Sequence, residues 1–323
     1  MPRLFLASRG LRAYEDQILP LLAAAGVEPV WTTVTDRPHK DDDFLAQLPG
    51  CAGVVVGPEG ISGRVLEAVP GLRVVARTGV GIDTVDVATA TRLGIWVTNT
   101  PGANHEAVAD LTIGLMLALA RQIPRHVEIA RSGSWARVPM VELHRKTLGL
   151  VGIGRVGRAV ARRAAGFDMA ILATDPYADQ AWCAASGVAL VPLDELLARS
   201  DAVSLHAVHT PETRHLLNAR TLALMKPGAF LINTARGELI DEAALLAALD
   251  AGRPAGAALD VLAHEPPSPD DPILRHPKVL VTPHIAGTTA ESTIRMGLQA
   301  VRNALAVLTG QRPPDPVNEP AVP

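Results

Sequence analysis

Short apolar segments alternate with longer mixed segments along most of the chain, and this alternation predicts strands followed by helices. The apolar segments are rich in Val, Leu and Ile, and each is short enough to form one buried strand. They are residues 4–7, 30–34, 52–56, 72–76, 95–98, 148–151, 169–174, 202–205, 228–233, 256–261 and 279–282. Strands that alternate with helices favour parallel β-α-β packing. We therefore expect an α/β protein.

Helical patterns lie between these strands, and two of the expected helices have special features. Helices are expected at 14–25, 62–69, 106–121, 123–132, 158–165, 219–225, 241–251 and 289–309. The helix at 106–121 is apolar on nearly all sides, which indicates burial between layers or against another subunit. The long helix at 289–309 is followed by a Pro-rich tail, 312–323, which we expect to be loosely ordered.

A glycine motif connects the strand at 148–151 to the helix that follows it. The motif reads Gly152-Ile153-Gly154-Arg155-Val156-Gly157, a G-x-G-x-x-G pattern between a strand and a helix. The first Gly permits a tight turn, the second lets the backbone approach a pyrophosphate, and the third lets the helix pack on the strand. The helix N-terminus offers N–H groups to that anion. The motif therefore predicts a dinucleotide site.

An acidic residue follows the motif at the spacing that a ribose ligand requires. The strand at 169–174 ends in Asp175, 23 residues after Gly152 (175 − 152). A carboxylate about 20 residues after the first Gly commonly binds the adenosine ribose hydroxyls. Its negative charge also repels a 2′-phosphate. The sequence therefore favours NAD over NADP as the cofactor.

The position of the glycine motif predicts the domain organisation. The motif lies in the middle of the chain, so a folded domain must precede it. We expect a dinucleotide-binding domain at 99–287, inserted into a smaller substrate domain made of 1–98 and 288–323. The chain then crosses between the domains twice, and the substrate would meet the cofactor in a cleft beside the crossings.

Composition and charge argue against several other classes of protein. The 323 residues carry a formal net charge of −3, which gives no electrostatic reason to bind nucleic acid or an anionic membrane. No apolar run reaches the ~18 residues of a membrane span. The N-terminus lacks the apolar region of a signal peptide, so we expect a cytoplasmic protein. Two distant cysteines, Cys51 and Cys183, and scattered histidines predict neither a disulfide nor a metal site.

Three polar residues follow the last three expected strands: Arg236, Glu265 and His284. Ligands of open α/β sheets bind at the carboxyl ends of the strands. A His exchanges protons near neutral pH, a carboxylate can orient its ring, and an Arg can bind a carboxylate through two hydrogen bonds. With NAD, this trio predicts interconversion of a 2-hydroxy acid and its 2-oxo acid. For each residue alone, a solvated loop position is the alternative.

Further motifs of the chain occur in the order found in a known family. Besides the glycine motif they are Arg77-Thr78-Gly79-Val80-Gly81-Ile82-Asp83, Asn99-Thr100-Pro101-Gly102, Asn233-Thr234-Ala235-Arg236-Gly237, Ala258-Leu259-Asp260-Val261, His264-Glu265-Pro266 and Pro283-His284-Ile285-Ala286-Gly287. With them the chain resembles the D-isomer-specific 2-hydroxyacid dehydrogenase family over nearly its whole length. The resemblance implies an NAD-binding Rossmann domain inserted into a smaller flavodoxin-like α/β domain. It also implies a homodimer formed through the helix at 106–121.

The same resemblance implies roles for individual residues. Arg236 would bind the substrate, Glu265 would be the partner acid and His284 the acid/base. The backbone N–H groups of Val80 and Gly81 would bind the substrate carboxylate. Arg77 is either a phosphate ligand or a surface charge. The cofactor would be contacted by Gly152, Gly154, Arg155, Val156, Gly157, Asp175, Ala207, Thr234, Ala235 and Asp260, of which Asp260 would hold the nicotinamide carboxamide.

The sequence leaves the substrate open. The resemblance is greatest to enzymes of 3-phosphoglycerate and of glyoxylate or hydroxypyruvate, and it does not decide between them. An NAD(H)-sensing, corepressor-like binding protein would share the fold and the trio, and a phosphite dehydrogenase would share the hydride chemistry. Turnover on a panel of acids distinguishes these alternatives.

Overall fold

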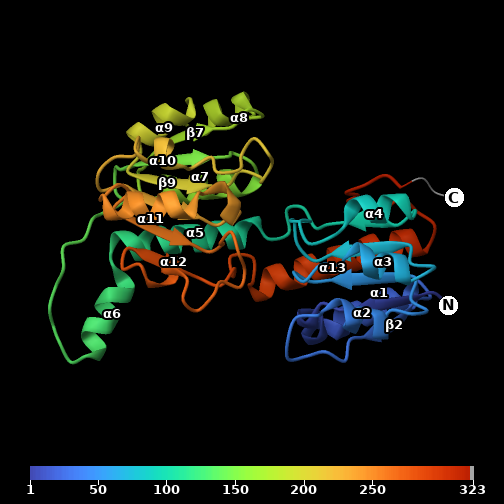
Figure 1. The fold of residues 1–323 in the computed structure, drawn as a ribbon. Helices are drawn as coiled ribbons and strands as arrows, with labels where there is room; N and C mark the ends of the chain where they lie inside the picture. The colour runs from blue at the N-terminus through green and yellow to red at the C-terminus, as the bar shows by residue number, and fades with distance from the viewer. Residues whose placement is uncertain (321–323) are drawn as a thin grey trace. The chain divides into compact units, whose positions relative to one another are not determined.

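The chain forms two compact units in the computed structural model, which describes residues 1–320 (Figure 1). Unit 1 comprises Met1–Asn104 and the residues from Gly287 onward, and unit 2 comprises His105–Ala286. Unit 2 is thus inserted into unit 1. The first crossing lies after Asn104, and not after Thr98 as expected from the sequence. The second crossing lies one residue before the expected one, since Gly287 belongs to unit 1.

Unit 1 contains a parallel sheet of five strands in the order β2-β1-β3-β4-β5. The strands are β1 (Arg3–Leu6), β2 (Glu28–Trp31), β3 (Gly53–Val56), β4 (Val74–Arg77) and β5 (Trp96–Thr98). The helices are η1 (Arg9–Tyr14), α1 (Glu15–Ala24), α2 (Asp41–Gln47), α3 (Gly63–Ala68), α4 (Val87–Arg92) and α13 (Ala290–Leu308). This strand order is that of flavodoxin-like sheets, so the expected fold of this part is confirmed.

Both faces of the unit 1 sheet are buried, because successive strand residues point to opposite faces. Phe5 packs on one face in a cluster with residues of α2, α3 and α4. Leu4 and Leu6 pack on the other face with residues of α1 and α13. The unbroken apolar strands of the sequence are explained by this double coverage.

Unit 2 contains a parallel sheet of seven strands in the order β12-β11-β10-β9-β6-β7-β8. The strands are β6 (Thr147–Val151), β7 (Ala170–Thr174), β8 (Val188–Leu190), β9 (Ala202–Leu205), β10 (Phe230–Asn233), β11 (Gly256–Leu259) and β12 (Val279–Val281). The order around β6 is the doubly wound Rossmann order with one further strand at the β12 edge. The expected Rossmann fold is therefore confirmed.

Helices cover both faces of the unit 2 sheet. They are α5 (His105–Ala120), α6 (Ile123–Arg131), α7 (Arg155–Ala165), α8 (Gln180–Ala185), α9 (Leu193–Arg199), α10 (Ala219–Leu222), η2 (Gly237–Leu239), α11 (Glu242–Asp250) and α12 (Pro272–Arg275). Residues of α5 and α7 share one buried cluster, and residues of α9 and α11 share the other. Among the unit 2 elements, the sequence did not predict α8, α9, α12, η2 or the short strand β8.

A ladder of hydrogen bonds from α13 explains why the first crossing lies after Asn104. Arg295 donates to the Ala103 carbonyl at 2.9 Å, Gln299 to the Pro101 carbonyl at 3.4 Å, and Asn303 to the Asn99 carbonyl at 3.1 Å. Four residues of helix rise about 6 Å, close to two residues of extended chain. Every fourth side chain of α13 therefore meets every second carbonyl of 99–103, and this segment stays with unit 1.

The Pro-rich tail is ordered as far as it is described, contrary to the expectation from the sequence. The N–H of Val317 donates to the Val97 carbonyl at 2.8 Å. The Asn318 side chain accepts from the Val97 N–H at 2.7 Å and donates to the Ile95 carbonyl at 3.0 Å. The tail therefore runs along β5, and residues 321–323 of the expected loose segment lie outside the described range.

Helix α6 has no buried residue, and with the segment after it α6 stands away from the rest of unit 2 (Figure 1). Together α5 and α6 have the length and composition of a membrane span, but they are bent by 60° at the break between them. Within residues 1–320, no single helix is long and apolar enough to cross a membrane.

Candidate active site

The glycine motif forms a tight turn whose three glycines have different surroundings. Gly152 has φ +96, and a Cβ there would lie 2.7 Å from backbone atoms of Ala207 and its predecessor. A Cβ on Gly157 would lie 2.3 Å from the Gly152 carbonyl oxygen. A Cβ on Gly154 would meet nothing within 4 Å. The first and third positions thus require glycine for packing, whereas the second faces open space in which a pyrophosphate could approach.

Helix α7 begins directly at this turn. Gly154 is its N-cap and Arg155 and Val156 are its first residues, so the helix starts earlier than the expected Arg158. The N–H groups of a first helical turn have no partner within the helix and attract anions. Both residues of the expected pyrophosphate loop therefore lie at the anion-binding end of α7.

Asp175 joins the glycine turn to the end of β7. Its Oδ2 accepts from the Ile153 N–H at 2.9 Å, and its Oδ1 accepts from the Tyr177 N–H at 2.8 Å. A carboxylate has about four acceptor positions, so both oxygens keep capacity for ligand hydroxyls. The carboxylate thus holds the turn in place and can also receive the ribose that the sequence predicts for it.

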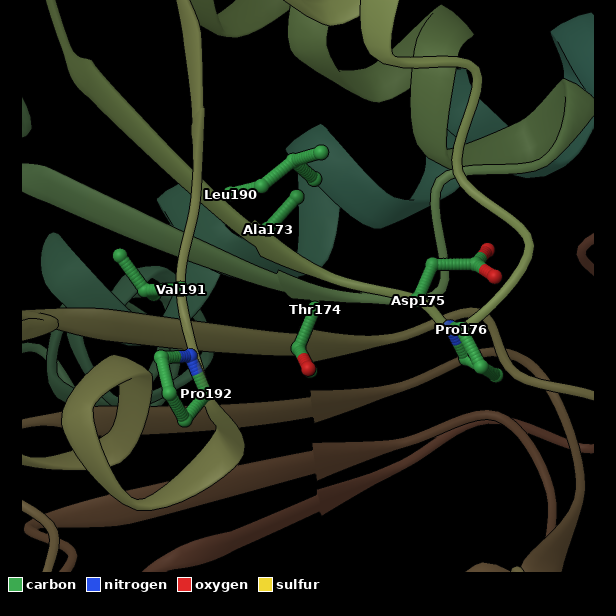
Figure 2. Close-up of a pocket in the computed structure, with 7 residues that line it drawn as sticks. All are labelled: Ala173, Thr174, Asp175, Pro176, Leu190, Val191 and Pro192. Carbon is green, nitrogen blue, oxygen red and sulfur yellow. The ribbon is translucent and has the colours of Figure 1, made fainter.

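A pocket lies beside Asp175 at the carboxyl ends of β7 and β8 (Figure 2). Its lining is Ala173, Thr174, Asp175, Pro176, Leu190, Val191 and Pro192. In Figure 2, Asp175 and Pro176 stand at one end of the pocket, and Val191 and Pro192 stand at the other. The pocket is mostly apolar with an acid at its rim, which suits an adenine ring and its ribose.

His284 and Glu265 are in direct contact at the carboxyl edge of the unit 2 sheet. His284 Nδ1 lies 2.7 Å from Glu265 Oε2, and Glu265 Oε1 accepts from the Leu262 N–H at 2.9 Å. Partial burial acts to raise the pKa of Glu265, but the hydrogen bonds from His284 and Leu262 and the charge of Arg236 outweigh it. The pKa of Glu265 is therefore lowered, and the carboxylate form faces His284.

Arg236 is brought to the same edge by close packing of the backbone after β10. A Cβ on Gly237 would lie 2.0 Å from the Leu262 backbone, so only glycine permits this approach. Asn233 is fully buried, accepts from the Ala235 N–H at 3.0 Å and donates to the Arg236 carbonyl at 2.8 Å. These bonds shape the turn that carries Arg236, which lies close enough for its charge to act on Glu265.

Asp260 holds the loop that carries His284. Asp260 is 1% exposed, and its Oδ1 accepts from the Thr282 hydroxyl at 2.6 Å and from the Ile285 N–H at 2.9 Å. Its Oδ2 accepts from the Ala286 N–H at 2.8 Å. His284 itself has a left-handed φ of 51° between these anchors. The carboxylate that the resemblance assigns to the nicotinamide thus makes three bonds to the His284 loop.

Thr234 contacts α5 from the end of β10. Its hydroxyl lies 2.9 Å from that of Thr112, which donates to the Val108 carbonyl at 2.8 Å. Thr112 is fully buried and Thr234 is 8% exposed. The side chain of Thr234 is therefore held against α5, while its backbone stays at the sheet edge on which the cofactor is expected.

The segment after β4 in unit 1 presents two adjacent amides. Within residues 1–320, the N–H groups of Val80 and Gly81 donate to no protein acceptor. The Val80 carbonyl accepts from the Asn99 side chain at 2.7 Å, which fixes the direction of the peptide. Arg77 at the end of β4 donates to the Thr78 carbonyl. Two adjacent N–H groups in a loop form a small anion-binding site.

The family of the chain is identified by a match between its sequence and the sequence model of a known domain family. Residues 113–286 match the model described as D-isomer specific 2-hydroxyacid dehydrogenase, NAD binding domain. The chain belongs to this family. The match covers most of unit 2 and supports NAD as the cofactor.

Relatives of this family match nearly the whole chain. A glyoxylate reductase of Korarchaeum cryptofilum is 40% identical over 99% of this chain and 97% of its own length. A D-3-phosphoglycerate dehydrogenase of Mycobacterium tuberculosis is 40% identical over 94% of this chain, but the chain spans only 58% of that relative. The crystal structure of the TT0316 protein from Thermus thermophilus has a TM-score of 0.84 and 36% identity, and covers 98% of this chain and 100% of its own.

Sequence reasoning missed several residues that shape the site of this dehydrogenase family member. Asn233, Thr112 and Thr282 act through side-chain bonds to the turn after β10, to Thr234 and to Asp260. Asn233 stands inside a quoted motif, at the end of an otherwise apolar strand, and that contrast was a usable signal. Thr112 lies in an apolar helix far away in the sequence, and its partner depends on the fold.

Among described residues, no group of three or more His, Cys, Asp and Glu could hold a metal ion. His206 at the end of β9 lies 2.9 Å from the Ser204 hydroxyl through Nε2. Desolvation lowers the pKa of His206 to about 3, so its ring is neutral at neutral pH. His206 is therefore not suited to act as an acid/base near neutral pH.

Proposed function

We propose that this chain is an NAD-dependent D-2-hydroxyacid dehydrogenase that interconverts a D-2-hydroxy acid and its 2-oxo acid. The observation that carries the proposal is the 2.7 Å contact between His284 and Glu265, in the same unit as the glycine turn. An imidazole held by a carboxylate is suited to move a proton at a substrate oxygen. NAD, when bound, accepts the hydride from the alcohol carbon or supplies it to the carbonyl carbon.

In the direction of reduction, His284 as imidazolium donates its Nε2 proton to the C2 oxygen of the oxo acid. Nδ1 keeps its hydrogen bond to Glu265, so the carboxylate stabilises the positive charge before the transfer and keeps the ring oriented afterwards. In the direction of oxidation, neutral His284 takes the hydroxyl proton back. One proton and one hydride are thus exchanged with each substrate molecule.

The substrate carboxylate is assigned to Arg236 and to the amides of Val80 and Gly81. A guanidinium can bind both carboxylate oxygens, which fixes the orientation of the C2 atom. The two amides, which have no protein acceptor among residues 1–320, supply further donors. Arg77 is the basic residue of the β4 segment, so a phosphorylated substrate would have few cations to bind there.

The cofactor assignment rests on surroundings that fit a dinucleotide. The open space beside Gly154 and the start of α7 fit a pyrophosphate, and the Asp175 pocket fits an adenosine. The nicotinamide end is assigned to the edge formed by Ala207, Thr234, Ala235 and Asp260. Because Asp175 is acidic, we expect NAD(H) to be preferred over NADP(H).

The test is NADH oxidation, followed by absorbance, with a panel of glyoxylate, hydroxypyruvate, 3-phosphohydroxypyruvate and pyruvate. We expect turnover of at least one oxo acid, and a loss of about 10²–10⁴-fold in kcat for His284→Ala. Binding of NADH without turnover of any acid would contradict the proposal and favour a sensing protein. Reduction of NAD by phosphite alone would contradict it in favour of a phosphite dehydrogenase.

We also propose that the chain forms a homodimer through α5, α6 and the segment that follows. Large apolar side chains are exposed there, namely Ile123, Val127, Trp135, Met140 and Val141. Trp135 is 83% exposed, which is costly for so large an apolar side chain without a partner surface. Light scattering of the wild-type protein should give twice the mass of one chain, and the Val127→Glu variant should have the mass of a single chain. A monomeric wild-type protein would contradict this assignment.

A further inference from the structure

A buried His–Glu pair lies in unit 1, outside the residues assigned to the reaction. His39 Nδ1 lies 3.1 Å from Glu59 Oε1, and the side chains are 0% and 5% exposed. His39 Nε2 lies 2.7 Å from the Thr32 hydroxyl. The His39 ring stacks on Phe44 at 5.0 Å and meets the edge of Phe5 at 6.3 Å. Both ring nitrogens therefore have partners, and the ring is fixed by aromatic packing.

The pair joins two loops at the carboxyl edge of the unit 1 sheet. Thr32 and His39 belong to the loop between β2 and α2, and Glu59 belongs to the loop between β3 and α3. A buried carboxylate is costly unless it is hydrogen-bonded. The contact with His39 thus determines where the Glu59 loop lies.

The Glu59 loop is tightly folded on itself and on the segment after β4. A Cβ on Gly57 would lie 2.3 Å from the Glu59 carboxylate, so a larger residue there would displace this carboxylate. Gly60 has φ +68, and a Cβ there would lie 2.0 Å from the Thr84 carbonyl oxygen. The Ile61 N–H donates to that same oxygen at 2.9 Å. The loop therefore carries one end of the segment that includes Val80 and Gly81.

The other end of this segment is fixed by separate bonds. The Thr78 N–H donates to the Val56 carbonyl at 2.9 Å, directly before the Glu59 loop. The Gly79 N–H donates to the Thr100 hydroxyl at 2.9 Å. The segment 79–83 thus arches between a fixed start at Thr78 and a fixed end at Thr84. Between these ends the Asn99 side chain also holds the Val80 carbonyl at 2.7 Å. A shift of the Glu59 loop would move the Thr84 end, and the Val80–Gly81 peptide would then leave the position in which both anchors hold it.

We propose that His39 and Glu59 are positioning residues that hold the Val80–Gly81 amides in the geometry that binds the substrate carboxylate. This inference rests on the proposed function, because it assigns those amides to the substrate. Neither His39 nor Glu59 needs to touch the substrate. Their effect is on substrate affinity, whereas the proton transfer at His284 and the cofactor site in unit 2 are left unchanged.

The test compares Glu59→Ala and Glu59→Gln with a matched control in the same unit. Asn318→Ala is the control, because it also removes buried hydrogen bonds in unit 1. These bonds are made to Ile95 and Val97 at β5, and not to the Glu59 loop or to the segment after β4. For each variant the measurements are KM and kcat for the best oxo acid, the dissociation constant of oxalate from the NADH complex, and the melting temperature. Oxalate is a dicarboxylate that binds without reacting.

For Glu59→Ala we expect KM and the oxalate dissociation constant to rise about tenfold, with kcat changed by less than about twofold. Glu59→Gln keeps an acceptor for His39 and should recover most of that affinity. Asn318→Ala should lower the melting temperature without changing KM. If Glu59→Ala does not fold, His39→Asn is measured with Glu59→Gln by the same two constants.

Equal KM and oxalate affinity in the wild type and in folded Glu59→Ala, or in His39→Asn where Glu59→Ala does not fold, would overturn the inference. A rise of KM in Asn318→Ala as large as in Glu59→Ala would also overturn it, since general loosening of unit 1 would then suffice. Failure of the proposed function has a different signature, because the wild type itself would turn over no oxo acid. In that case the oxalate titration still tests the pair.

Discussion

Replacing Asp260 by Asn is a sharp test of how the site is held together. In the native loop the carboxylate accepts three hydrogen bonds, from the Thr282 hydroxyl and from the Ile285 and Ala286 N–H groups. An amide has one oxygen and one NH₂ group, so one side of the Asn must present hydrogens to an N–H group. At least one charge-assisted bond is then lost, and a donor–donor contact takes its place.

The size of the effect follows from this count. A hydrogen bond to a charged group contributes about 1.5–3 kcal/mol, and the loss falls on the loop that gives His284 its left-handed φ of 51°. If the loop then populates other conformations, kcat should fall by roughly 10- to 100-fold. Because the acid/base is displaced before any substrate binds, the loss should appear in kcat more than in the substrate KM.

The assay must separate the loop role of Asp260 from the carboxamide role that the family resemblance implies. We would measure wild type and Asp260→Asn with NADH and with its 3-acetylpyridine analogue, in which a methyl ketone replaces the carboxamide. If Asp260 acts through the loop, the ratio of the wild-type rate to the Asp260→Asn rate should be the same with both cofactors. A ratio that falls to one with the analogue would refute the loop argument and assign the whole effect to the carboxamide.

Three further predictions concern the glycine turn, the partner acid and the buried imidazole. Gly154→Ala should weaken NADH binding at an unchanged melting temperature, whereas Gly157→Ala should lower the melting temperature. The reason is that a Cβ on Gly157 meets backbone atoms and a Cβ on Gly154 does not. NADH titration and thermal unfolding of both variants check this. Glu265→Gln should move the pH–rate profile of reduction to lower pH, because an amide stabilises imidazolium less than a carboxylate does, and an unmoved profile would argue against the pair. The lowered pKa of His206 means that the unfolded state binds more protons, so stability should fall as pH drops from about 6.5 toward 3, by at most about 1.4 kcal/mol per pH unit. Urea unfolding of His206→Gln between pH 7 and 4 should show a smaller fall, and parallel curves would count against this.

The alternation of apolar and mixed segments was sufficient to predict every described strand except β8, because the other strands of these covered parallel sheets are mainly apolar. The elements that escaped prediction are short or half exposed. In β8, Ala189 and Leu190 are exposed at the sheet edge, so its pattern differs little from a loop. In α9 the signal is seven residues long, and only Leu196 and Leu197 are buried.

The candidate site was predictable where it depends on residue type at a strand end, as with Glu265 and His284. It was not predictable where it depends on a partner far away in the sequence. The domain boundary shows the same limit. Its position after Asn104 depends on hydrogen bonds from side chains of α13, nearly two hundred residues later in the sequence. The His39–Glu59 pair carries no motif, and only the fold brings its two loops together.

The tail along β5 has a consequence for solubility. An edge strand offers free N–H and C=O groups to any passing strand, which is a common route to aggregation. In unit 1 the tail occupies these groups on β5 through Val317 and Asn318. The opposite edge, β2, carries Glu28 and Pro29, and a proline has no N–H to offer a further strand. The two edges of one sheet are thus closed to intermolecular pairing by two different means, and loss of the tail would open one of them.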